Sequence, residues 1–182
     1  MSTRGPETGS RRHGSAEAAF EALFRTHGAA LCHFAASYVR TPAVAEDLVH
    51  DVFCDIWDRW DELGPRGPER PYLYRAVRNK ALNWIKHREV HQRWSDTQEA
   101  EPAAEDASRD VEYGELRQAL ADALDGLPGR QRDVYLMARQ RDLSYSEIAE
   151  ALEISPKSVE NHMGRALKRL RKVLSGFFSV VL

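Results

Sequence analysis

Apolar residues recur along most of the chain at helical spacing, three or four positions apart, and this spacing predicts an almost entirely α-helical protein. No stretch shows the sustained alternation of apolar and polar residues that is typical of strands. The first half should form three helices, starting near Ala16, at Pro42 after a Thr41 cap, and near Pro71, with the third ending near His91. We expect the apolar faces of these helices to consist of Phe20, Leu23, Phe24, Leu31, Phe34, Tyr38, Leu48, Val49, Val52, Ile56, Trp57, Trp60, Leu73, Tyr74, Val77, Ala81, Trp84 and Ile85.

The second half begins near Val111, with a helix that Gly126 and Pro128 end and another over about Gly129–Arg141. The clearest local signals follow. Ser144 and Glu147 fit a capping box that opens a short helix, and Ser155-Pro156 starts a long one. A short helix, a tight turn and a long helix predict a helix-turn-helix. The apolar face of the long helix should hold Val159, Met163, Ala166, Leu167, Leu170 and Leu174.

The net charge of −2 conceals a strongly segregated distribution. Residues 42–62 carry seven acids and a single base, whereas residues 70–93 carry seven bases and a single acid. Residues 94–115 are again acidic, and residues 154–172 hold six bases against one acid. The basic blocks favour contact with nucleic acid, although a solvated basic face on an ordinary helical hairpin is the simpler alternative.

These patterns predict an all-α protein of two small helical domains, residues 16–93 and 111–175, the second being the helix-turn-helix. Residues 94–110 are rich in Ser, Asp, Glu, Ala and Pro and should form a flexible acidic linker. Residues 1–15 should be a disordered tail, and residues 176–182 an apolar C-terminal tail of undecided role. We find no signal peptide or membrane span, and we expect a cytoplasmic protein.

Two segments then resemble the two conserved domains of the sigma-70 family of RNA polymerase sigma factors, in its extracytoplasmic-function (ECF) group. The first reads AEDLVHDVFCDIWDRW from Ala45 and PYLYRAVRNKALNWIKHR from Pro71. The second reads LPGRQRDVYLMARQRDLSYSEIAEALEISPKSVENHMGRALKRL from Leu127. The resemblance implies that residues 16–93 are sigma region 2 and residues 111–175 are sigma region 4. Such a protein binds core RNA polymerase and directs promoter-specific transcription initiation.

By this resemblance, an acidic helix face of region 2 docks on a basic coiled coil of the polymerase. A row of carboxylates suits pairing with arginines on a partner helix, although on an isolated helix it would simply be a solvated face. The residues that we expect to bind polymerase are Asp47, His50, Asp51 and Asp55. His50 stands where family members usually carry glutamine.

The basic helix from Pro71 resembles the part of region 2 that reads and melts the minus-10 element. Cationic and polar side chains on this helix would hold the unstacked bases. The candidates are Arg75, Asn79, Asn83, Lys86 and His87, with Asn83 standing where aspartate is common. Trp84 and Tyr74 are expected to pack in the core rather than to stack on DNA.

Region 4 would read the minus-35 element as duplex DNA through the long helix of the helix-turn-helix. Its candidates for groove and phosphate contacts are Lys157, Ser158, Asn161, His162, Arg165, Lys168, Arg169 and Lys172. In the turn, Glu153 stands where glycine is usual, which predicts a strained left-handed residue.

An enzyme is the remotest reading, because the chain carries no phosphate loop, metal cluster or nucleophile motif, and no cofactor is expected. His87 and His91 lie four residues apart but lack a third metal ligand, and Cys32 and Cys54 are expected to be buried free thiols.

A helix-turn-helix regulator that never joins polymerase is the alternative function. The resemblance also implies a possible anti-sigma partner.

Overall fold

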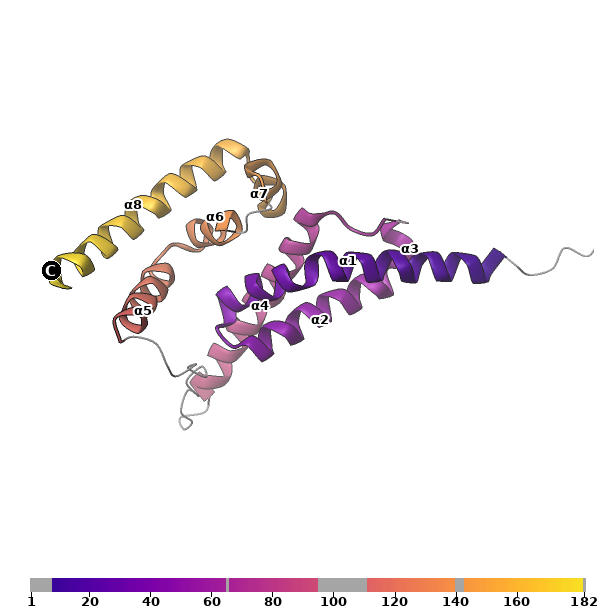
Figure 1. Ribbon diagram of the computed structural model, residues 1–182, viewed down its shortest axis with the longest axis horizontal. Helices are drawn as coiled ribbons and strands as arrows, with labels where there is room; N and C mark the ends of the chain where they lie inside the picture. The colour runs from indigo at the N-terminus through magenta and orange to yellow at the C-terminus, as the bar shows by residue number, and fades with distance from the viewer. Residues whose placement is uncertain (1–7, 65, 95–110, 140–142, 182) are drawn as a thin grey trace, which may run out of the picture. The chain divides into compact units, whose positions relative to one another are not determined.

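The computed structural model describes residues 8–64, 66–94, 111–139 and 143–181. These residues form eight α-helices and no strand, which confirms the all-α fold predicted from the spacing of apolar residues (Figure 1). The chain divides into two compact units, Met1–Glu99 and Ala100–Leu182, which we call domain 1 and domain 2. Most of the expected acidic linker, residues 95–110, lies outside the described residues.

Domain 1 consists of α1 (Thr8–Val39), α2 (Pro42–Asp58), the short α3 (Trp60–Leu63) and α4 (Arg70–Trp94). Helices α1, α2 and α4 pack against one another, and each turns its apolar face into a shared core. The largest fully buried side chains of this core are Tyr74, Phe34, Phe53, Leu31, Ile56, Leu73, Val49, Val52 and Val77.

The helix boundaries of domain 1 differ from the predicted ones at several places. Helix α1 begins at Thr8, so residues 8–15 of the expected tail are helical, in keeping with their continuity with the alanine-rich stretch that follows. Helix α4 extends to Trp94, the first residue assigned to the linker. Thr41 occupies the N-cap position of α2, but its side chain makes no capping hydrogen bond.

Four side chains of domain 1 are more exposed than their sequence pattern suggests. Trp57 was expected on the buried face of α2, yet 40% of it is exposed, and Phe24 is 46% exposed. The prediction of two buried thiols is wrong, because Cys54 is exposed and Cys32 is only half-buried, although both cysteines are free. Trp57 contacts the ring of Phe20 at 4.9 Å, so it borders the core without being covered.

Gly67, in the segment between α3 and α4, supports a buried tryptophan. Its φ is +68°, and an added Cβ would lie 2.7 Å from the ring of Trp60, which is only 6% exposed. We expect Gly67→Ala to destabilise domain 1 by roughly 2–4 kcal/mol, from overpacking and left-handed strain together. Thermal denaturation followed by circular dichroism measures the loss. Gly64→Ala is the control, because Gly64 has a φ of +85° but nothing near its Cβ position; an equal loss in both variants would contradict a role for the Trp60 contact.

Domain 2 consists of α5 (Val111–Asp125), α6 (Gly129–Arg139), α7 (Tyr145–Leu152) and α8 (Pro156–Val181). Helix α8 packs against each of the other three helices and is the central element of the core. Its buried face includes Val159, Ala166 and Leu170, but Leu167, which was predicted to be buried, is 45% exposed. The backbone of α8 continues as helix through residues 176–181, which were predicted to form a separate tail.

The predicted capping signals of the helix-turn-helix are confirmed. The Ser144 hydroxyl accepts a hydrogen bond from the Glu147 N–H at 3.2 Å, and the Glu147 carboxylate accepts one from the Ser144 N–H at 2.8 Å. Ser155 caps α8, since its hydroxyl accepts a hydrogen bond from the Ser158 N–H at 3.1 Å. Glu153 has φ 55° and ψ 46°, the left-handed conformation predicted for it.

We expect Glu153→Gly to raise the thermal stability of domain 2. Glycine removes a left-handed strain of about 1–2 kcal/mol from the folded domain. The greater conformational freedom that glycine gives the unfolded chain offsets about half of this stabilisation. For a domain of this size the melting temperature should rise by about 2–8 °C, as measured by circular dichroism. Glu153→Ala, which removes the charge but keeps the strained Cβ, is the control. A melting temperature for Glu153→Gly no higher than that of the wild type would contradict the strained turn.

Candidate functional surfaces

An acidic surface lies along the outside of α2. Asp47, Asp51 and Asp55 are all exposed and follow one another at intervals of four residues, so they form a row on one side of the helix. His50 is also exposed, about 60° around the helix from Asp47. The four residues that the sequence singled out for polymerase binding therefore form one continuous surface, which we call the α2 acidic face.

Lys80 of α4 reaches this face, which the sequence reasoning did not anticipate. Its ammonium lies 3.0 Å from the Asp55 carboxylate and 3.9 Å from that of Asp51. The Lys80 side chain is 34% exposed, against 62% and 64% for the two aspartates. Part of the charge on the α2 acidic face is thus balanced from within domain 1.

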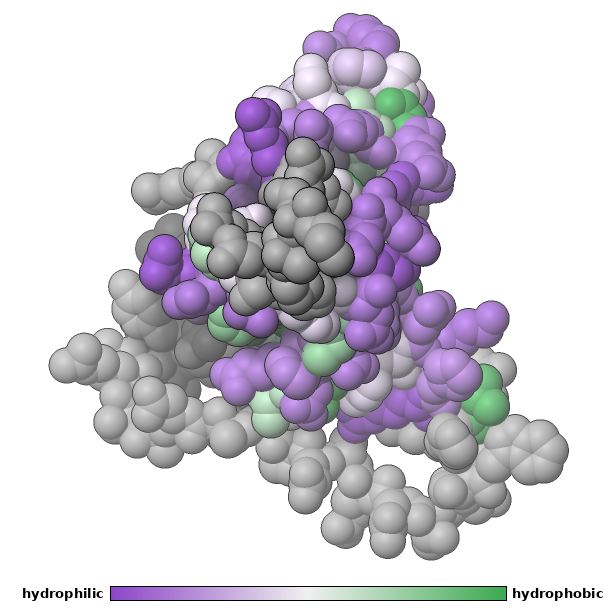
Figure 2. Space-filling view, turned by 90° about the vertical axis from the view of Figure 1, so that its right-hand side faces the viewer, coloured by the Kyte–Doolittle hydropathy of each residue, from purple (hydrophilic) through white to green (hydrophobic). Residues whose placement is uncertain are grey.

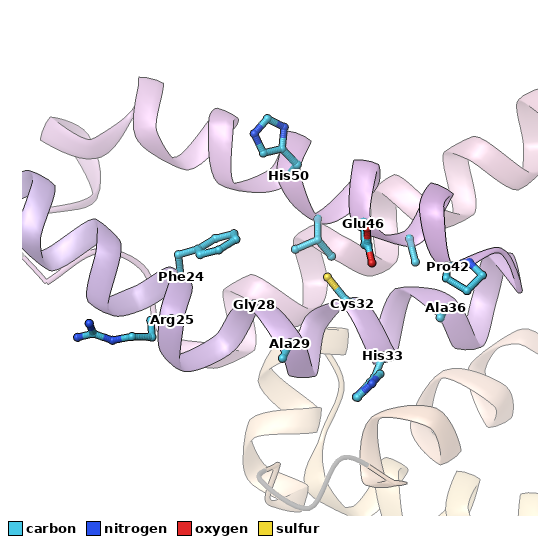
Figure 3. A pocket seen from close by; sticks show the side chains of 12 residues that line it. Phe24, Arg25, Gly28, Ala29, Cys32, His33, Ala36, Pro42, Glu46 and His50 are labelled. Carbon is cyan, nitrogen blue, oxygen red and sulfur yellow. The ribbon is translucent and has the colours of Figure 1, made fainter.

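A groove of about 830 Å³ runs between α1 and α2 beside the acidic face (Figure 3). Its lining is mostly apolar, and His50 stands on its rim. Cys32 points from α1 into the space between the helices, close to Glu46 of α2 (Figure 3). Burial raises the pKa of the Cys32 thiol, and the negative charge of Glu46 raises it further, so this thiol stays neutral.

A second groove, of about 530 Å³, continues along the same pair of helices. It shares Phe24 and His50 with the first groove and adds Trp57 and Cys54. The exposed Phe24 and Trp57 therefore line grooves that border the α2 acidic face at His50. A partner that meets the carboxylates would also meet apolar surface.

Most of the basic and polar residues singled out on α4 lie at its surface. Asn79, Asn83, Lys86 and His87 are exposed, and Arg75 is half-buried with its guanidinium 5.7 Å from the centre of the Tyr72 ring. The Asn79 side-chain oxygen accepts a hydrogen bond from Arg78 at 3.2 Å, which fixes the amide orientation.

The two aromatic residues of α4 behave differently from each other. Tyr74 is 2% exposed and packs in the core, as predicted. Trp84 is only half-buried, and the guanidinium of Arg88 lies 5.3 Å from its ring centre. Trp84 therefore contributes to the surface of α4 as well as to its packing.

On α8, the exposed basic and polar residues form a stripe on the side opposite the core. Asn161, Arg165, Lys168 and Lys172 fall within about 60° of one another around the helix, and Arg169 is exposed at the edge of this stripe. The N-terminus of α8 is capped by Ser155, and the stripe gives this helix a cationic and polar face on the side away from the core.

Three of the other predicted groove residues are already engaged or partly covered. The Lys157 ammonium donates to the Glu160 carboxylate at 2.7 Å, and this hydrogen bond raises the pKa of Lys157. Ser158 is half-buried and its hydroxyl is 2.9 Å from that of Ser155. His162 is half-buried, with its Nδ1 covered and without a hydrogen-bond partner among the described residues. Asn161 and Arg165 are exposed, unlike Ser158 and His162.

Within the described ranges, no group of three or more side chains is arranged to hold a metal ion. None of the described helices is long and apolar enough to span a membrane. In the face shown in Figure 2, hydrophilic residues cover most of the coloured surface and apolar residues form small separate patches.

Comparison with known proteins assigns both domains. Residues 23–90 match the family model of sigma-70 region 2, and residues 117–170 match that of sigma-70 region 4. The chain is 31% identical over 155 residues to the RNA polymerase sigma-E factor of Streptomyces avermitilis, covering 85% of this chain and 84% of that relative.

Two solved structures share the fold. The structure of CnrH in complex with the cytosolic domain of CnrY matches with a TM-score of 0.66 and 27% identity, covering 91% of this chain and 97% of that one. The sigma factor RpoE in complex with the anti-sigma factor NepR from Bartonella quintana matches with a TM-score of 0.64 and 24% identity, covering 86% and 96%. The chain therefore belongs to the sigma-70 family of RNA polymerase sigma factors, in the extracytoplasmic-function group, and is an initiation factor that binds core RNA polymerase and directs it to promoters.

Proposed function

We propose that the two domains divide the recognition of a promoter between them. Domain 1 docks on polymerase through the α2 acidic face and holds the melted minus-10 element on α4. Domain 2 reads the duplex minus-35 element with α8. The observation that carries this proposal is the segregation of charge onto separate exposed faces, acidic on α2 and basic on α4 and α8.

Docking is supported by the chemistry of the α2 acidic face. Asp47, Asp51 and Asp55 present a row of exposed carboxylates, which suits arginines along a helix of a basic coiled coil. The neighbouring groove offers apolar surface for the same coiled coil. His50 stands between the two, where its imidazole is placed to donate a hydrogen bond to the docked helix.

Melting requires that unpaired bases find a new environment on the protein. On α4, Asn79 and Asn83 offer donors and acceptors for base edges, and Lys86 offers a charge for phosphate. Arg75 and His87 complete this proposed minus-10 surface. Because α4 packs on both α1 and α2, the surface is held rigidly beside the docking face.

For the minus-35 element, we assign base reading to Asn161 and Arg165 and phosphate contacts to Lys168, Arg169 and Lys172. Ser158 and His162 then serve chiefly to anchor and pack the start of α8, because both are partly covered. Lys157 contacts DNA only when its ion pair with Glu160 gives way.

The assignment on α8 is tested by two substitutions measured on the complete holoenzyme. Arg165→Ala should weaken binding to a promoter by about 5- to 150-fold and should have little effect on a promoter whose minus-35 element is scrambled. Lys172→Ala should weaken binding to both promoters alike and lower the salt slope by about 0.9. Equal losses on both promoters for Arg165→Ala would contradict a base-reading role.

Regulation by an anti-sigma factor is part of the proposal. Two ECF-type folds of the same kind are known in complexes, one with the cytosolic domain of CnrY and one with the anti-sigma factor NepR. We propose that such a partner covers the α2 acidic face and its groove and thereby competes with polymerase. Recovery of polymerase alone from the native host under all conditions would oppose this.

The chain itself performs no catalysis under this proposal, since polymerase carries out the chemistry, and it acts in the cytoplasm where polymerase and DNA are found. A stand-alone regulator would use the helix-turn-helix in the same way. That alternative gives the α2 acidic face no role, and the match of residues 23–90 to sigma-70 region 2 does not favour it.

A further inference from the structure

Lys80 connects the two proposed surfaces of domain 1. It follows Asn79 in the sequence, so it lies about 100° around α4 from that residue and about 60° from Asn83. It lies only about 20° from His87, so it stands at the edge of the minus-10 surface, but its side chain reaches toward α2, where the ammonium meets Asp55 at 3.0 Å and Asp51 at 3.9 Å. Lys80 therefore belongs to the DNA-contacting helix but is bound to the docking face.

We infer that Lys80 competes with core polymerase for Asp51 and Asp55. Polymerase displaces the Lys80 ammonium from these carboxylates when it docks, and the freed ammonium then becomes available to promoter DNA. The inference rests on the proposed function, in which Asp51 and Asp55 receive cations from polymerase and α4 contacts the minus-10 element. A carboxylate that pairs with a polymerase arginine in bidentate geometry gives up the single-point contact with an ammonium.

The displaced ammonium has the reach to contact DNA. A lysine side chain is a flexible four-carbon stem with a charge at its end, and the Lys80 side chain is already one-third exposed. Once it leaves the carboxylates, repulsion from the docked arginines drives it away from α2. The remaining direction is along α4, where phosphates of the melted strand lie next to Asn79 and Asn83 in the proposed complex.

This arrangement makes docking and promoter binding help each other. In the free protein, Lys80 weakens polymerase binding and is itself unavailable to DNA. In the holoenzyme, the same lysine contributes to DNA affinity. Because coupling between two binding events is reciprocal, DNA that captures Lys80 also frees Asp51 and Asp55 for polymerase.

Two substitutions of Lys80 should shift polymerase affinity in opposite directions. Lys80→Met keeps the length of the stem but removes the charge, so core polymerase should bind about three to ten times more tightly, the range expected for loss of exposed ion pairs. Lys80→Arg offers a bidentate partner to the aspartates, so polymerase should bind this variant more weakly than the wild type. A purely structural role for Lys80 would instead make Lys80→Met the weaker binder.

Promoter binding by the holoenzyme provides the second readout. Lys80→Met should lower the affinity of saturated holoenzyme for a pre-melted promoter by about three- to tenfold and reduce the salt slope by about 0.7, the value for one phosphate contact on a single strand. Lys86→Met is the matched control on the same helix: it should reduce DNA affinity while leaving polymerase affinity unchanged. A holoenzyme in which Lys80→Met leaves DNA affinity and salt slope unaltered overturns the inference.

A third variant separates failure of this inference from failure of the proposed docking face. Asp47 is on the docking face but is not a partner of Lys80 in either ion pair. If Asp47→Lys abolishes polymerase binding while Lys80→Met fails to strengthen it, only the inference about Lys80 is wrong. If Asp47→Lys leaves polymerase binding intact, the docking face itself is wrongly assigned.

Discussion

Core RNA polymerase should no longer bind a variant in which Asp47 and Asp51 are both replaced by lysine. Each reversal removes a carboxylate from the α2 acidic face and places a cation where, under the proposal, the polymerase presents its own. Removal of one partner from a close interfacial charge pair typically costs about 2–5 kcal/mol, and repulsion adds to this cost. Affinity should therefore fall by at least about 100-fold, as measured by titration of core polymerase with fluorescently labelled protein.

The loss should be specific to the docking face. A variant with Glu21→Lys and Asp61→Lys carries the same change in net charge on exposed residues of domain 1 outside that face. It should bind polymerase within about threefold of the wild type at physiological salt, where distant surface charges are screened. Comparable losses in the two double variants would point to overall charge rather than to the α2 acidic face.

Phe34→Ala should remove most of the stability of domain 1. The Phe34 side chain is fully buried, and its ring centre lies 5.0 Å from that of Tyr74 and 5.3 Å from that of Tyr38. The substitution leaves a cavity between α1 and α4 and should cost about 3–5 kcal/mol, a large part of the total stability expected of a domain. Urea denaturation followed by circular dichroism measures the loss.

Phe24→Ala on the same helix is the control for this prediction. Phe24 is 46% exposed and touches the ring of Phe53 at 4.8 Å, so its removal should cost only about 1 kcal/mol. Similar losses in the two variants would contradict the assignment of the core. Because α2 and α4 both pack on α1, Phe34→Ala should also reduce transcription in proportion to the fraction unfolded.

Sequence alone predicted those features of the fold that depend on local chemistry. The capping box of Ser144 and Glu147, the cap at Ser155 and the left-handed Glu153 all follow from hydrogen bonds and steric limits within a few residues. The helix-turn-helix could thus be placed before any packing was known. The acidic and basic helix faces were equally predictable from the sequence, because helical periodicity decides which residues share a side of a helix.

Features at the edges of the apolar faces were not predictable in this way. Trp57 and Leu167 were both assigned to buried faces, and both are 40% exposed or more. Each lies at the border of the apolar arc of its helix, where exposure depends on how far the neighbouring helix extends. The width of a buried face is decided by tertiary packing, and the sequence pattern fixes only its centre.

The role of Lys80 was hidden for a related reason. It was visible only as one of seven bases in residues 70–93, and it was not among the minus-10 candidates. Only the packing of α4 against α2 brings its ammonium to Asp51 and Asp55. A base that lies off the main basic face of its helix, in a domain with an acidic helix nearby, is the signal that could have indicated it.

Run-off transcription tests the central claim most directly. Bacterial core polymerase is incubated with a pool of promoter fragments, with and without the full-length protein. We predict initiation that depends on the protein and occurs at a defined subset of fragments sharing a minus-35 and a minus-10 element. If the protein supports no initiation and does not bind core polymerase, the assignment of domain 1 to docking and melting is contradicted.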